Sequence, residues 1–97
     1  MENLTDHVPY TPEKFNSKIL LNQDGQKTIL FAFAQGQGLK THTTPNQAVL
    51  VVLEGTAHFM MEDQTHDLTS GTAIYIPANV PHALTAVTDF KMLLVKP

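Results

Sequence analysis

Two histidines, His42 and His82, each lie in a pattern of spaced glycine and proline residues and could perform chemistry. A neutral imidazole is a common metal ligand, and it exchanges a proton near neutral pH. The two patterns read Gly36-x5-His42-x-Thr44-x3-Ala48-x6-Gly55 and Gly71-x5-Pro77-x-Asn79-x2-His82. Each histidine is therefore a candidate metal ligand, a candidate proton carrier, or a residue in the wall of a cavity.

Short apolar runs, separated by turn residues, surround both histidines. The runs are KILL at 18–21, TILFAFA at 28–34, AVLVVLE at 48–54, TAHFMME at 56–62, AIYI at 73–76, HALTAV at 82–87 and FKMLLV at 90–95, with a shorter one at 66–68. Their β-branched and aromatic residues, and their spacing of about 8 to 12 residues, are typical of an antiparallel sandwich or barrel. We expect a hairpin turn at Asp24-Gly25 and a loop from Gly36 to Pro45.

The length of 97 residues predicts one domain with a modest core. We assign residues 18–97 to the barrel and residues 1–17 to an N-terminal tail or edge segment. Within that segment, Thr11-Pro12-Glu13 could begin a single helical turn, because proline is favoured at the first helical position.

Side-chain alternation along the strands predicts which residues share the inner face. His42 and Thr44 lie on one face, and His82 shares a face with Leu84. On the strand at 56–62, Phe59 is expected to point inward, so His58 points outward. Ala48 and Met92 complete the residues that we expect to line the cavity.

The composition excludes several classes of function. A net charge of −3, with only six scattered lysines and arginines, gives no basic surface for nucleic acid. No apolar run reaches the roughly 18 to 20 residues needed to cross a bilayer. We therefore expect a soluble, cytoplasmic protein that binds neither nucleic acid nor membrane. Its low charged fraction, 15%, favours a homodimer.

Taken together, the two motifs make the chain similar to the cupins, specifically to compact single-domain bacterial members. The resemblance covers roughly residues 28 to 95 and implies an antiparallel jelly-roll β-barrel. It further implies that His42 and His82 occupy the first and last metal-ligand positions, inside the barrel near its open end.

The chain departs from the cupin pattern at four positions. Thr44 replaces the second histidine, Ala48 the glutamate, Asn79 a turn glycine and Ala86 an asparagine. Asn79 is a mild change, because asparagine tolerates the left-handed backbone conformation. The losses at Thr44 and Ala48 remove two metal ligands of the family, one of them anionic.

Three interpretations of the site remain open. In the first, Mn, Fe, Ni or Zn binds weakly at His42 and His82, with water, substrate or Gln47 completing the shell. In the second, a histidine performs acid/base catalysis without a metal, although Glu54, Asp63, Asp67 and Asp89 are not spaced to orient it. In the third, the cavity binds a small molecule.

The leading hypothesis is the third: a small-molecule-binding cupin with a reduced or absent metal centre at His42 and His82. Its apolar wall is expected to come from Phe31, Phe33, Phe59, Leu84, Phe90, Met92 and Leu94. The alternative is a metal-dependent dioxygenase or isomerase. We expect His7, His58 and His66 to be exposed or at an interface.

Overall fold

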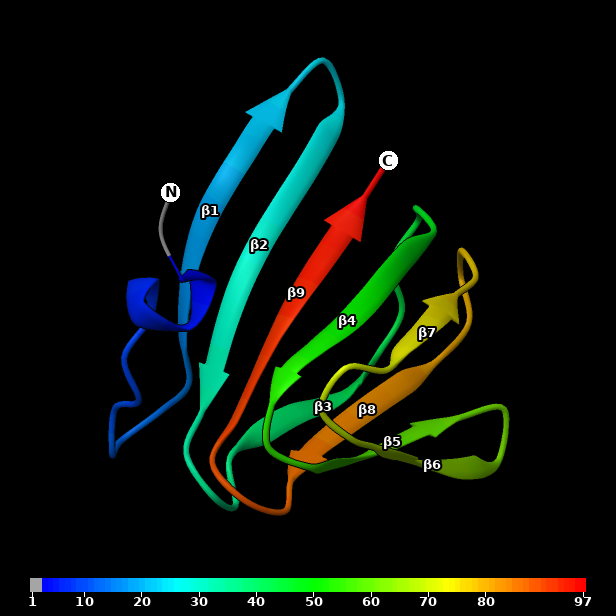
Figure 1. Ribbon diagram of the computed structural model, residues 1–97. Helices are drawn as coiled ribbons and strands as arrows, with labels where there is room; N and C mark the ends of the chain where they lie inside the picture. Colours follow the sequence, from blue (N-terminus) through cyan, green and yellow to red (C-terminus); the bar gives the residue numbers. More distant parts are fainter. Residues whose placement is uncertain (1–2) are drawn as a thin grey trace.

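Glycine, asparagine and acidic turn residues divide the chain into short antiparallel strands. The computed structural model describes residues 3–97, which form a short 3-10 helix and nine strands (Figure 1). These are η1 (Leu4–His7), β1 (Asn16–Gln23), β2 (Gln26–Phe33), β3 (Gly38–His42), β4 (Ala48–Glu54), β5 (Ala57–Met61), β6 (Gln64–Leu68), β7 (Ala73–Ile76), β8 (His82–Ala86) and β9 (Phe90–Lys96). The fold is all-β, as the sequence predicts.

The strands form two sheets that face each other. The five-stranded sheet has the order β1-β2-β9-β4-β7, and the four-stranded sheet has the order β3-β8-β5-β6. All pairs are antiparallel. The hairpin of β1 and β2 extends beyond the rest of the barrel, close to the end of β9 (Figure 1). This arrangement confirms the predicted jelly-roll barrel.

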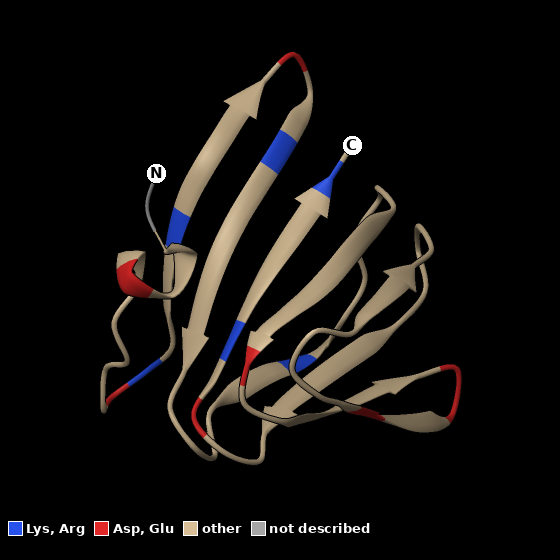
Figure 2. Ribbon diagram, in the orientation of Figure 1, with Lys and Arg blue, Asp and Glu red and all other residues tan. Residues whose placement is uncertain are grey.

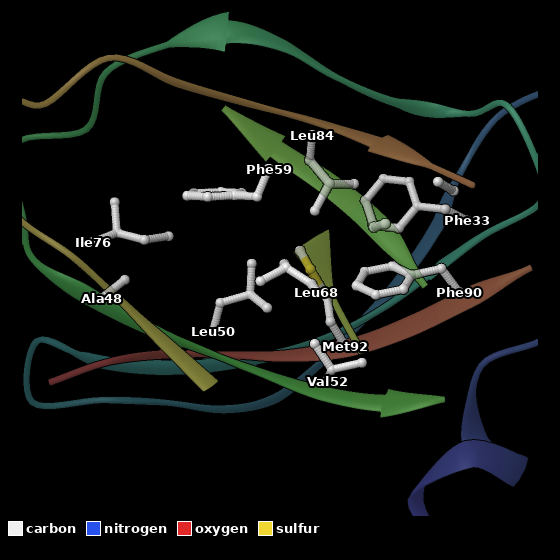
Figure 3. Close-up of a cluster of buried hydrophobic side chains, with 12 residues drawn as sticks. Phe33, Ala48, Leu50, Val52, Phe59, Leu68, Ile76, Leu84, Phe90 and Met92 are labelled. Carbon is white, nitrogen blue, oxygen red and sulfur yellow. The ribbon is translucent and has the colours of Figure 1, made fainter. Parts of the chain in front are cut away.

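The main core lies between the sheets (Figure 3). Phe59 and Leu84 from the four-stranded sheet face Leu50, Val52 and Met92 from the five-stranded sheet (Figure 3). Each is at most 2% exposed. Burying such a side chain contributes about 1.5 to 3 kcal/mol, so alternation along each strand stabilises the two-layer arrangement.

The N-terminal segment covers the outer face of the five-stranded sheet. Val8 packs there with Leu30 and Ala32 in a second cluster of buried residues. Lys91, only 8% exposed, donates a hydrogen bond to the carbonyl of Thr5 and lies 4.6 Å above the ring of Tyr10. The segment is thus anchored to the sheet. Residues 1 and 2 of the predicted tail lie outside the described residues.

Tyr10 provides a further anchor for the same segment. Its hydroxyl donates a 2.5 Å hydrogen bond to Glu54. Burial and this hydrogen bond both raise the pKa of Tyr10, so the phenol keeps its proton and remains a donor.

Two local predictions were wrong. Residues 12–14 form bends, and the helical turn lies at Leu4–His7, where Asn3 accepts a hydrogen bond from the backbone of Thr5. The expected loop from Gly36 to Pro45 contains β3, because its backbone pairs with β8. Tertiary pairing therefore makes a strand from a sequence rich in glycine and threonine.

Gly55 joins β4 to β5 at a close approach between backbones. Its φ is +83°, and a Cβ atom there would lie 1.9 Å from the carbonyl oxygen of Asp89. Only glycine avoids both the strained φ and the collision. The motif glycine therefore fixes how the two sheets join.

No helix within residues 3–97 has the length and apolar character needed to span a bilayer.

Candidate ligand-binding site

Strand pairing brings the two motif histidines together. β3 and β8 run antiparallel, and His42 is directly opposite His82 in their register. A register irregularity between Leu39 and His42 precedes this pair. The two imidazole centroids lie 4.3 Å apart, with the rings inclined by 61°. Residues 40 positions apart in the chain thus form one pair at the end of the four-stranded sheet.

The loop before His82 is fastened to the segment after His42. The backbone N–H of Asn79 donates a 2.8 Å hydrogen bond to the carbonyl of Thr44. Asn79 has φ +63°, the left-handed conformation expected for this turn position. The replacement of the family glycine by asparagine therefore leaves the turn intact.

In each imidazole, Nδ1 forms a hydrogen bond with a backbone carbonyl. His42 Nδ1 lies 2.7 Å from the carbonyl of Lys40, and His82 Nδ1 lies 2.9 Å from the carbonyl of Val80. A carbonyl only accepts, so Nδ1 carries the proton in both rings. In the neutral rings, Nε2 is left as an acceptor or ligand atom.

The two histidines differ in their contact with water. His82 is 7% exposed and stacks on Phe59 at a centroid distance of 5.8 Å, whereas His42 is exposed. Burial lowers the pKa of His82 below its ordinary value, and the charges of His42 and Lys96 lower it further. The hydrogen bond to Val80 opposes that shift. Burial has the largest effect, so His82 is neutral at pH 7.

Both rings border a cavity of about 160 Å³ between the two sheets. Its lining includes all seven residues assigned to the cavity from the sequence, namely His42, Thr44, Ala48, Phe59, His82, Leu84 and Met92. Phe31 and Leu94 from the five-stranded sheet line it as well. His42 is the exposed member of the histidine pair that borders the cavity.

Two of the aromatic residues expected in the cavity wall lie elsewhere. Phe33 and Phe90 are fully buried in the core, with ring centroids 6.3 Å apart, and do not border the cavity. Phe15 of the N-terminal segment packs on Phe33 at 5.2 Å. The alternation of side chains along each strand predicts that both rings point inward. It does not distinguish a residue of the packed core from a residue that lines a cavity.

Sequence reasoning missed Lys96, which lines the cavity from the end of β9. The signal was present in the alternation of that strand, because Met92, Leu94 and Lys96 share a face. The cavity therefore has a cationic group in addition to its two imidazoles and Thr44.

The residues around the histidines do not fit a typical protein metal site, which uses three or more side-chain ligands. Among residues 3–97, no group of three or more His, Cys, Asp or Glu side chains could hold an ion. Gln47 does not supply the missing ligand, because its carbonyl accepts a 2.8 Å hydrogen bond from Tyr75. Thr44 donates its hydroxyl proton to the carbonyl of Asn46.

Three of the four candidate orienting carboxylates bind other groups. Asp67 pairs with His58 at 2.8 Å on the exposed face, and Asp89 accepts from the backbone of Gln35. Glu54 accepts from Tyr10 on the outer face. The imidazoles of His42 and His82 are thus oriented by backbone carbonyls rather than by carboxylates.

The remaining histidines were expected to be exposed or at an interface. His58 is exposed on the face opposite the buried Phe59, as predicted. His66 is half-buried, because it lies directly opposite Phe59 in the pairing of β5 and β6.

Comparisons with known proteins agree with this fold. The family model for the cupin domain matches residues 29–96, so the chain belongs to the cupin family. No curated protein matches the chain.

Solved structures extend the similarity over nearly the whole chain. A protein of unknown function from Streptococcus pyogenes is 31% identical with a TM-score of 0.92, covering 99% of this chain and 84% of that one. A cupin superfamily protein from Desulfitobacterium hafniense is 26% identical with a TM-score of 0.91, covering 96% and 85%. The DMSP lyase DddQ from Ruegeria pomeroyi, 22% identical over 87% and 47% with a TM-score of 0.79, shares the fold.

The lowered pKa of His82 predicts how stability depends on pH. Above its ordinary pKa of 6.5, His82 is neutral in both the folded and the unfolded chain. As pH falls below 6.5, the unfolded chain binds a proton before the folded one, so the free energy of unfolding decreases. Urea denaturation between about pH 8 and pH 5 should therefore show an acid slope that His82→Gln reduces.

The control is His42→Gln, which removes the exposed imidazole beside His82 and one of the charges that lower its pKa. Because burial is the largest cause of the lowered pKa, this variant should keep most of that slope. Equal slopes in the wild type and His82→Gln would contradict the assignment.

Proposed function

We propose that this cupin is a binding module that holds one small, mainly apolar molecule between its two sheets. The observation that carries the proposal is the cavity of about 160 Å³, lined by aromatic and aliphatic side chains with a few polar groups at one end. Such a lining is typical of small-molecule sites. A cavity of about 150 Å³ accommodates a molecule the size of benzene.

A packing test addresses the cavity directly. Ala48 is 3% exposed and borders the space, so Ala48→Leu should fill part of it. We expect the neutral probe benzyl alcohol to bind the wild type and to lose about tenfold or more in affinity in this variant, measured by ligand-observed NMR. Val49→Leu, at the next position on β4, is the matched control because its side chain points to the other face.

Equal binding of benzyl alcohol to wild type and Ala48→Leu, or no binding to either, would count against the proposed site. A thermal melt of each variant separates loss of the cavity from loss of the fold.

The alternative function is a metal-dependent dioxygenase or isomerase, in which water or substrate completes the shell around His42 and His82. The binding-module proposal predicts substantially less than stoichiometric metal in purified protein reloaded with Mn, Fe, Ni or Zn. Elemental analysis measures this. Near-stoichiometric metal that is lost in His42→Ala and His82→Ala would favour the enzyme instead.

We also propose that the protein is a homodimer that forms through β1. This strand is at the edge of the five-stranded sheet, and its Ile19, Leu20 and Leu21 are 52%, 41% and 43% exposed. Consecutive exposed aliphatic residues on an unpaired edge favour association. A cytoplasmic location, inferred from the sequence, stays a prediction.

Substitution of the edge tests this assembly. The wild type should sediment as a dimer, and the double variant Ile19→Lys with Leu21→Lys should sediment as a monomer in analytical ultracentrifugation. Tyr75→Lys alters an exposed side chain on β7, at the opposite edge, and should leave the dimer intact. A monomeric wild type, or a dimeric double variant, would refute the proposed interface.

A further inference from the structure

The cavity contains a cation that the proposed binding function does not explain. Lys96 is half-buried at the end of β9 and borders the cavity with Met92 and Leu94. No acidic side chain of the described residues lines this space. An ammonium group beside an apolar surface is unfavourable unless an anion or water satisfies its donors.

A second cation lies beside the first. Lys27 on β2 is directly opposite Lys96 in the antiparallel register, so the two side chains share a face of the sheet. Figure 2 shows these two basic positions near each other at the ends of β2 and β9. Like charges in directly opposite positions repel, and this pair therefore favours an anion between or beside them.

No carboxylate of the protein supplies that anion. Within residues 3–97, neither Lys27 nor Lys96 forms an ion pair with an aspartate or glutamate. Asp24 is close in sequence to Lys27, but it lies in the turn between β1 and β2. The two ammonium groups are thus available to a bound molecule.

The two histidines and Thr44 do not offer the lysines' kind of hydrogen-bond donor to an anion in the cavity. The Nδ1 atoms of His42 and His82 already hydrogen-bond to the carbonyls of Lys40 and Val80. The hydroxyl proton of Thr44 is already donated to Asn46. An anionic ligand would therefore be oriented by the lysines.

We propose that the cavity binds a small carboxylate, with its anionic group at Lys96 and Lys27 and its apolar body between Phe31, Phe59 and Met92. This inference rests on the proposed binding function. The volume of about 160 Å³ limits the body to about the size of one six-membered ring.

The choice of a carboxylate over a phosphate follows from the donors. Phosphates in proteins are commonly bound by arginine forks, helix N-termini or glycine-rich backbone loops. The chain contains no arginine, and its described 3-10 helix lies outside the barrel on the N-terminal segment. Lys96 at the border of an apolar space, with Lys27 opposite it on the neighbouring strand, matches a singly charged carboxylate.

The test compares isosteres in the full-length protein, in buffer with EDTA. Benzoate and its neutral counterpart benzamide are titrated by ligand-observed NMR. We expect benzoate to bind about tenfold more tightly, because charge-assisted hydrogen bonds are roughly twice as strong as neutral ones. This preference should decrease with added salt.

Substitutions of the lysines test whether the preference for benzoate over benzamide depends on this site. Lys96→Met should reduce the affinity for benzoate to that for benzamide, and Lys96→Arg should restore the preference. Lys27→Met should cause a smaller loss. Lys40→Met is the matched control, because Lys40 is an exposed lysine on β3 that does not line the cavity.

The outcomes separate the two proposals. If benzamide binds as tightly as benzoate, or if Lys96→Met leaves the affinity for benzoate unchanged, the carboxylate inference is wrong while the binding function stands. If benzoate, benzamide and benzyl alcohol all fail to bind a folded wild type, both proposals are wrong.

Discussion

The pairing of β3 with β8 is the constraint on which the site depends. It places His42 opposite His82, and the hydrogen bond from Asn79 to Thr44 holds the loop before β8 against the segment after β3. The same pairing continues through β5, which brings Phe59 under the ring of His82. Backbone carbonyls and a packed aromatic ring therefore position the two imidazoles.

This scaffold explains how a cupin site can lose ligands and remain ordered. Thr44 and Ala48 stand where the cupin pattern has a histidine and a glutamate, so the cavity lacks the charge of that glutamate. Ala48 adds an apolar side chain to the cavity wall. The hydroxyl of Thr44 donates a hydrogen bond to the carbonyl of Asn46. Lys96 borders the cavity, and no acidic side chain of the described residues lines it. This distribution of charge agrees with the proposed binding of an anionic group.

Much of the fold could be predicted from local sequence. The apolar runs that form β2, β4, β5 and β9 alternate with polar residues, and burial of one face follows from that period. The left-handed turns at Asp24-Gly25 and Asn79 follow from residue type. The strand β3 was missed, because glycine and threonine next to a turn carry no strong local preference and pairing with β8 decides its conformation.

The sequence by itself determined an all-β fold, because side-chain period and turn chemistry are local properties. The two spaced motifs carried the resemblance to the cupins, and that resemblance implied that His42 and His82 lie inside the barrel. Only the tertiary structure decided that Phe33 and Phe90 are core and that Lys96 borders a cavity. It also decided that Lys27 lies opposite Lys96. Alternation assigns a residue to a face, whereas the space in front of that face depends on how the opposite sheet packs against it.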